Sequence, residues 1–174
     1  MVTIRQEQKN DYRKTEEVVK EAFLKEEFSD KTEHELVKRI RECDAFVPEL
    51  SIVAVDEDIV GHIMLSKITI EQCGTSVESL ALAPVSVARG HQKKGIGGKL
   101  ITAALEKAKE LGYGSVVVLG HPEYYPKFGF KKASEWNVKA PFEVSEEVFM
   151  IKELTENALL GVEGIVQYSS AFAE

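Results

Sequence analysis

The most informative absence in this sequence is local, because no aspartate or glutamate occurs between Glu78 and Glu106 although the whole chain has a net charge of −7. Cysteine is also scarce. The two cysteines, Cys43 and Cys73, lie far apart and form no C-x-x-C or Cys/His spacing. This argues against a disulfide framework and against a zinc site, so we expect no metal.

Long apolar runs are missing as well. No stretch approaches the roughly 20 apolar residues that a membrane-spanning helix needs, and no basic-plus-apolar signal opens the chain. The acidic net charge argues against a general nucleic-acid or anionic-membrane binder. We therefore expect a cytoplasmic protein with no nucleic acid and no membrane among its partners.

What the chain does have is enough apolar sequence for one core. It has 174 residues, 44% of them hydrophobic, which fits a single globular domain over residues 1–174. We find no internal repeat, low-complexity tract or linker, and so predict no second domain.

The carboxylate-free segment holds a basic, glycine-rich run. Glycines in Gln92–Gly98 allow successive backbone N–H groups to point into one concavity, and helix-periodic apolar residues follow at once. A helix N-terminus at this position favours an anion. The basic side chains around the run are Arg89, His91, Lys93, Lys94 and Lys99. The segment therefore predicts a phosphate site, although two adjacent lysines are elsewhere most often a solvated turn.

Two common phosphate loops do not match this run. A dinucleotide fingerprint needs a glycine where Leu100 stands, and a Walker A loop needs a glycine at Lys93 and a Ser or Thr after Lys99. A different phosphate ligand is therefore expected.

Helices are predicted where apolar residues recur at helical spacing. Asn10 or Asp11 can cap the first, and Thr32 with Glu35 three residues later predicts a capping box for the second. The helix after the glycine run should end at Gly112.

Strands are predicted from β-rich segments bounded by turn residues. In chain order they are residues 2–5, 50–55, 59–70, 77–87, 115–119, 148–151 and 164–168. Pro84 cannot donate to a ladder, so its strand should bulge or splay there. Strand, loop, helix and the buried strand Ser115–Leu119 form a βαβ unit with a parallel pair.

These motifs resemble the GNAT family of N-acetyltransferases. Gln92–Gly97 matches its Q/R-x-x-G-x-G/A motif, and Val87 stands where the family has a valine on a splayed fourth strand. The segments Leu80–Val87 and Val118–Phe130 are similar to the bacterial YhbS-like branch of that family. The resemblance implies an α/β (α+β) fold, in which helices flank a mixed, mostly antiparallel sheet with splayed middle strands. Residues 131–174 would add C-terminal strands that complete the sheet and the substrate side.

The resemblance also implies acetyl-coenzyme A (acetyl-CoA) as co-substrate, with its pyrophosphate on loop amides and its pantetheine arm along the splayed strand. The residues so assigned are Val85, Ser86, Val87, Gln92, Lys93, Lys94, Gly95, Ile96, Gly97 and Gly98. Physical chemistry agrees, since a phosphate-rich ligand favours an amide nest and a peptide-like arm favours an unpaired strand edge. Arg89-Gly90 departs from the family, which often has a proline there.

For catalysis, the resemblance assigns Tyr125 as the general acid that protonates the coenzyme's sulfur, whereas packing is the alternative role for this aromatic residue. Glu78 is a candidate base, with a solvated strand-end carboxylate as the alternative. His62 is a second candidate base, with a structural or exposed role as the alternative. His121 lies near the expected mouth of the arm channel and could bind the acceptor or the coenzyme, with a helix-start or loop hydrogen bond as the alternative.

The resulting hypothesis is acetyl transfer by direct attack to a primary amine of a small molecule or peptide. The alternative is a non-catalytic acyl-CoA-binding sensor or regulatory module. A second alternative is an enzyme that transfers a longer acyl group. The tail residues Phe142, Phe149 and Tyr168 could line an apolar pocket, a homodimer contact or ordinary core. The acceptor is not identified by the sequence.

Overall fold

The computed structural model describes residues 1–24, 26 and 29–173. It contains two compact units, and the strands β3 (Asp58–Gln72) and β4 (Thr75–Val87) each contribute residues to both. The first unit comprises Met1–Ser66 and Ala83–Lys107, and the second comprises Lys67–Leu82 and Ala108–Glu174. A single domain over the whole chain stays a prediction.

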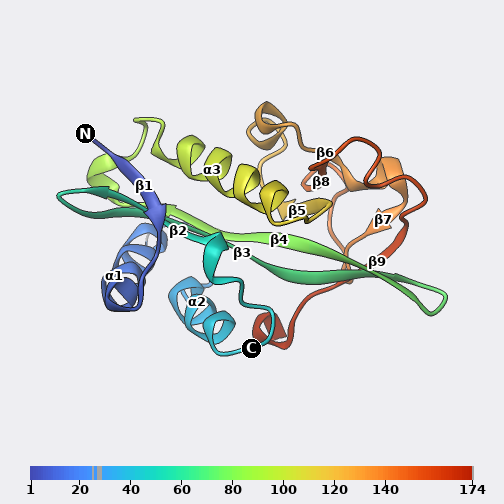
Figure 1. Cartoon of the computed structure of the whole chain (residues 1–174), viewed down its shortest axis with the longest axis horizontal. Coiled ribbons are helices and arrows are strands. Elements are labelled where there is room, and N and C mark those ends of the chain that lie inside the picture. The colour runs from blue at the N-terminus through green and yellow to red at the C-terminus, as the bar shows by residue number, and fades with distance from the viewer. Residues whose placement is uncertain (25, 27–28, 174) are drawn as a thin grey trace. The chain divides into compact units, whose positions relative to one another are not determined.

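In the first unit, β1 (Thr3–Gln6) pairs with β2 (Ser51–Asp56), and β2 pairs with β3, both antiparallel. The apolar stripe of α1 (Tyr12–Phe23) and that of α2 (Glu33–Arg41) are buried, as amphipathic helices that cover a sheet require. These two helices lie on one face of the strands, whereas α3 (Ile96–Glu110) begins on the other (Figure 1).

Both predicted helix starts differ from expectation in their caps. Thr32 does precede α2, but its hydroxyl donates to Asp30 Oδ1 at 2.7 Å and makes no capping bond, so the predicted capping box is wrong. Asp11 precedes α1 without capping it. Its carboxylate instead accepts from both terminal nitrogens of Arg5, at 2.7 and 3.1 Å. In each case the side chain bonds to another polar group and not to the N-terminus of the α-helix.

The second unit is built on the other ends of β3 and β4. Here β4 pairs with β5 (Ser115–Leu119) in parallel, as the βαβ pattern predicted, and β5 pairs with β8 (Phe149–Glu153) antiparallel. The remaining strands of this unit are β6 (Lys131–Lys132), β7 (Val138–Lys139) and β9 (Gly164–Gln167). β6 pairs with β8, and β9 joins β3 antiparallel and β7 in parallel.

Short 3-10 helices connect these elements. They are η1 (Lys9–Asp11), η2 (Pro48–Leu50), η3 (Arg89–His91), η4 (Tyr125–Phe128), η5 (Ala133–Trp136) and η6 (Ser170–Ala173). Of the described helices, none is both long enough and apolar enough to cross a bilayer.

The predicted fold class is confirmed. Antiparallel pairs outnumber parallel ones, so the sheet is mixed and mostly antiparallel, and helices flank it. The β4–β5 pairing consists of Leu80 and Ala81 with Val116 and Val117, although both strands continue beyond it. The middle strands therefore separate after two paired residues, as expected of splayed strands.

Candidate functional site

The predicted phosphate loop connects β4 to α3 in the first unit. Two of its residues have positive φ, +64° at Lys93 and +80° at Gly95. Left-handed residues within a turn bring successive backbone N–H groups onto one side, which is the geometry of an anion-binding nest. Gly95 O accepts the first helical bond of α3, from Lys99 N at 3.1 Å. The nest and the helix N-terminus therefore adjoin, as the sequence predicted.

The loop is anchored at its strand end. Gln92 Nε2 donates to Val87 O at 3.0 Å, and Ala88 N donates to Val60 O at 2.7 Å. His91 Nε2 lies 3.6 Å from Asp56 Oδ2. One basic residue of the segment therefore lies beside a carboxylate at the end of β2.

The other basic residues of the loop are exposed to solvent. Lys93, Lys94 and Lys99 have no carboxylate partner within the described part of the chain. A side chain built on Gly95 would meet nothing within 4 Å. The loop therefore presents unpaired positive charge around an open space.

The strand before the loop has an unsatisfied polar atom. Ser86 is buried, and its Oγ has no hydrogen-bond partner. Gly61 of β3 allows close approach here, since a Cβ at this position would lie 3.1 Å from Ser86 O and from the Leu100 side chain. Buried hydroxyls are normally paired, so Ser86 is a candidate contact for a ligand along Val85–Val87.

Tyr125 lies in the second unit, at the start of η4. Only 8% of it is exposed, and its ring packs edge-to-face on Tyr124 and Phe130, with centroids 5.2 and 5.7 Å away. Burial, followed by the neighbouring Tyr124, raises the pKa of Tyr125 to about 12. Among the described residues its hydroxyl has no hydrogen-bond partner. The phenol is therefore fixed by packing alone and stays protonated well above neutral pH.

A glycine that the sequence reasoning missed determines the position of this ring. Gly120 follows β5 and donates its N–H to Val148 O at 2.9 Å. A Cβ on Gly120 would lie 2.3 Å from Tyr125 Cε2, which is too close for any side chain. The available sequence signal was a glycine directly after a buried strand, which often marks close approach of another group.

Glu78 is exposed on β4, also in the second unit. The parallel register pairs Leu80 with Val116, which places Glu78 level with Gly114. Gly120 lies six residues further along, and at about 3.3 Å per residue the separation is roughly 20 Å. The structure therefore does not bring Glu78 near the Tyr125 ring. His121 is exposed in the turn between Gly120 and η4.

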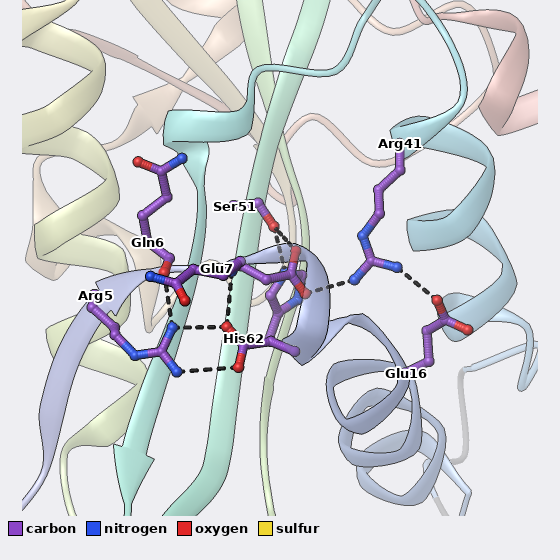
Figure 2. Close-up of polar contacts among 9 residues, drawn as sticks. Arg5, Gln6, Glu7, Glu16, Arg41, Ser51 and His62 are labelled. Atoms are coloured by element: carbon purple, nitrogen blue, oxygen red, sulfur yellow. Dashed lines mark hydrogen bonds and ion pairs between the residues drawn. The ribbon is translucent and has the colours of Figure 1, made fainter.

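The first unit contains a buried ionic network that the sequence did not predict (Figure 2). The Glu7 carboxylate accepts from Ser51 Oγ at 2.7 Å and from Arg41 Nη2 at 2.6 Å. Arg41 Nη1 donates to Glu16 Oε2 at 2.6 Å, and its guanidinium lies 3.9 Å over the Tyr12 ring. The side chains of Glu7 and Arg41 are only 1% and 5% exposed, so this pair is buried. It connects the segment after β1 to α2, and the contacts of Arg41 with Glu16 and Tyr12 add α1.

His62, the alternative base, belongs to the same network. Its Nε2 lies 2.9 Å from Ser51 Oγ. An ionised carboxylate only accepts, so Ser51 donates to Glu7 and accepts from a protonated Nε2 of His62, which assigns the tautomer. Burial, and more weakly Arg41, lower the pKa of His62 to about 4, while Glu7 opposes them. The imidazole is therefore neutral near pH 7, and its buried Nδ1 has no partner.

The second unit also has an open pocket of about 630 Å³. It is formed by η5, β7, the start of β8 and the segment between β7 and β8. Its lining residues are Ser134, Val138, Lys139, Ala140, Phe142, Glu143, Val144, Ser145, Glu146 and Phe149. Of the tail residues singled out in the sequence, Phe142 and Phe149 line this pocket and Tyr168 stacks on Phe142. Within the described residues, no group of three or more His, Cys, Asp or Glu side chains is arranged to hold a metal ion.

Loop, splayed strands and flanking helices are the features of one acetyltransferase class, and comparison with known families agrees. The model of the acetyltransferase (GNAT) family matches residues 4–130. The chain belongs to the GNAT family. The predicted family, and an acetyltransferase as the class of enzyme, are confirmed.

Among its relatives, the uncharacterized N-acetyltransferase YhbS of Escherichia coli K12 is 30% identical over 154 residues, covering 87% of this chain and 90% of YhbS. The structure of E. coli YhbS in complex with CoA has a TM-score of 0.86 at 28% identity and covers 99% of this chain and 92% of that one. A GNAT family acetyltransferase of Brucella melitensis in complex with acetyl-CoA has a TM-score of 0.81 at 30% identity, with coverage of 99% and 98%. The resemblance to the YhbS-like branch is therefore confirmed.

Proposed function

We propose that this protein transfers an acetyl group from acetyl-CoA to a primary amine of a small molecule or peptide, by direct attack of the amine. The observation that carries the proposal is the open, left-handed loop at Lys93 and Gly95, with its free lysines, directly before α3. The solved relatives with CoA and acetyl-CoA support the choice of this ligand among phosphate-bearing molecules.

For the donor, loop amides from Gln92 to Gly98 bind the pyrophosphate, and the lysines add charge at the rim. The pantetheine arm lies along Val85–Val87, where β4 has left its pairing with β5. A peptide-like arm can hydrogen-bond to such a strand edge. Ser86 Oγ, which lacks a partner, is available to the same arm.

For the reaction, the neutral amine attacks the thioester carbonyl carbon, and the tetrahedral intermediate collapses with cleavage of the C–S bond. The Tyr125 hydroxyl donates to the departing thiolate. With a pKa raised to about 12, against about 8.5 for an ordinary thiol, the phenol stabilises the thiolate mainly as a hydrogen-bond donor. The proton that the amine loses on acetylation goes to solvent.

No protein base is assigned in this scheme. The separation of Glu78 from Gly120 does not favour Glu78, and a buried imidazole with a pKa of about 4 is too weak a base for an amine. An amine of pKa near 8 is neutral in roughly one molecule in ten at pH 7, and a lysine-like alkyl amine near 10.4 in roughly one in several thousand. Without a protein base, either amine reacts through its neutral fraction, so the rate should rise with pH until the amine is deprotonated. Both cysteines are free, which fits a cytoplasmic location.

The test is release of free thiol from acetyl-CoA with a panel of amines, together with detection of the acetylated product by mass spectrometry. The proposal expects thiol release that depends on one class of amine and falls strongly in Tyr125→Phe, while coenzyme binding is retained. Tight CoA binding with no acetylated amine would instead support the sensor alternative.

A further inference from the structure

The pocket of the second unit has a preformed aromatic wall. Phe142 is 47% exposed, yet its ring stacks on Tyr168 at 6.2 Å and 16°, and Tyr168 packs on Phe172 at 5.0 Å. Val144 beside it is 38% exposed, whereas Phe149 at the base is buried. A volume of about 630 Å³ suits a small molecule. The exposed Phe142 ring is held in place by packing on Tyr168, which favours an apolar ligand.

The charges of the pocket select the ligand further. Glu146 lies 3.9 Å from Lys132, so its charge is partly balanced. Glu143 and Lys139 both line the pocket, and neither has an ion-pair partner among the described residues. A carboxylate over an apolar wall suits one ammonium group, and the single lysine disfavours a ligand with several positive charges.

The pocket and Tyr125 lie at the same end of β5. Phe149 pairs with Leu119, and residues directly opposite each other share one face of a sheet. The next residue, Gly120, points to the other face, where the Tyr125 ring covers it. An amine that approaches from the pocket and a phenol on the opposite face would act on a thioester from two sides. Attack by the amine on the carbonyl carbon and donation by the phenol to the sulfur involve different atoms of the thioester, and this arrangement leaves room for both.

We propose that this pocket is the acceptor site and that it takes a small primary amine with one positive charge on an apolar, preferably aromatic, body. The inference rests on the proposed function and adds the substrate class to it. Phe142 provides the wall and Glu143 the contact for the ammonium group.

The chain contains a natural reporter for this site. Trp136 is its sole tryptophan and lies between the lining residues Ser134 and Val138. We therefore expect 2-phenylethylamine to change the tryptophan fluorescence in a saturable way. The neutral isostere 2-phenylethanol should bind about fivefold more weakly, the upper value for an exposed ionic contact. Spermidine and L-phenylalanine should also bind more weakly than 2-phenylethylamine.

Variants test the two proposed contacts. Glu143→Gln should raise the Kd for 2-phenylethylamine about three- to fivefold, and Phe142→Ala about tenfold. Glu156→Gln makes the same charge change at an exposed site outside the pocket and should leave the Kd unchanged. Lys139→Gln removes a repelling charge and should lower the Kd about two- to threefold. A general loss of structure would not raise the Kd in Glu143→Gln and lower it in Lys139→Gln.

Equal binding of the amine and the alcohol, tighter binding of L-phenylalanine or spermidine, or equal shifts in Glu143→Gln and Glu156→Gln would each overturn the assignment. Thiol release from acetyl-CoA is measured in parallel, where Glu143→Gln should raise KM for 2-phenylethylamine without changing kcat. Glu143-dependent binding without thiol release would contradict the proposed function alone. Thiol release that does not depend on Glu143 or Phe142 would contradict the pocket alone.

Discussion

Replacing Gly95 by alanine tests the phosphate loop with a single methyl group. The φ of Gly95 is +80°, and a Cβ there would meet nothing within 4 Å. The substitution therefore creates no clash with other atoms and changes only the backbone preference. Holding a non-glycine residue in the left-handed region costs about 1–2 kcal/mol. Because the loop is exposed, we expect it to relax in the free protein and to take up this strain on binding.

The predicted result is a loss of CoA affinity of about 5- to 30-fold in Gly95→Ala, measured by isothermal titration. Gly90→Ala is the matched control, since Gly90 lies in the same loop, also has open space around its Cβ, and does not have a positive φ. Urea unfolding of both variants shows whether the strain appears in the free protein instead. A Gly95→Ala protein with unchanged affinity and unchanged stability, or equal losses in both variants, would refute the assigned loop geometry.

Three further predictions concern the rest of the site. Tyr125→Phe should lower kcat with little change in CoA affinity. In the wild type, deprotonation of Tyr125 should cause no loss of kcat up to pH 10, because its pKa is raised to about 12. A fall in kcat below pH 10 that disappears in Tyr125→Phe would contradict this. Gly120→Ala should also lower kcat, because the new methyl group displaces the Tyr125 ring. Gly114→Ala is the control and should leave kcat unchanged, since a Cβ there would lie 3.4 Å from its nearest neighbour. Equal kcat values in the two variants would refute the contact. The folded pKa of His62, about 4, lies below the unfolded value of 6.5, so protons bind preferentially to the unfolded chain as pH falls. Wild-type stability should therefore drop by about 2 kcal/mol more than that of His62→Gln between pH 7 and pH 5 in urea titrations, and parallel losses would show that His62 does not titrate this way.

Local sequence predicted those features that depend on neighbouring residues. The glycine loop before α3 and the buried strand after the helix have their cause within a few residues, and the structure has them where they were expected. The strand that contains Pro84 is also present, and it runs without a break from Thr75 to Val87. The capping box failed because spacing alone does not show that Asp30 competes for the Thr32 hydroxyl.

Features that depend on pairing across the chain were not predictable in this way. The network of Glu7, Arg41, Ser51 and His62 joins four segments, and each residue alone is an ordinary polar residue in its own segment. Glu78 was a candidate base because it lies on the strand before the loop. Its distance from Gly120 depends on the register between β4 and β5, which the sequence alone does not give.

The central claim is acetyl transfer from the coenzyme to an amine, and simultaneous counting of both products tests it most directly. The protein is incubated with acetyl-CoA and 2-phenylethylamine or another member of an amine panel, and free thiol and N-acetylated amine are quantified in the same sample. The account predicts the two products in equal amounts, with both strongly reduced in Tyr125→Phe. CoA binding with no acetylated amine across the panel, or equal product formation by Tyr125→Phe, would contradict it.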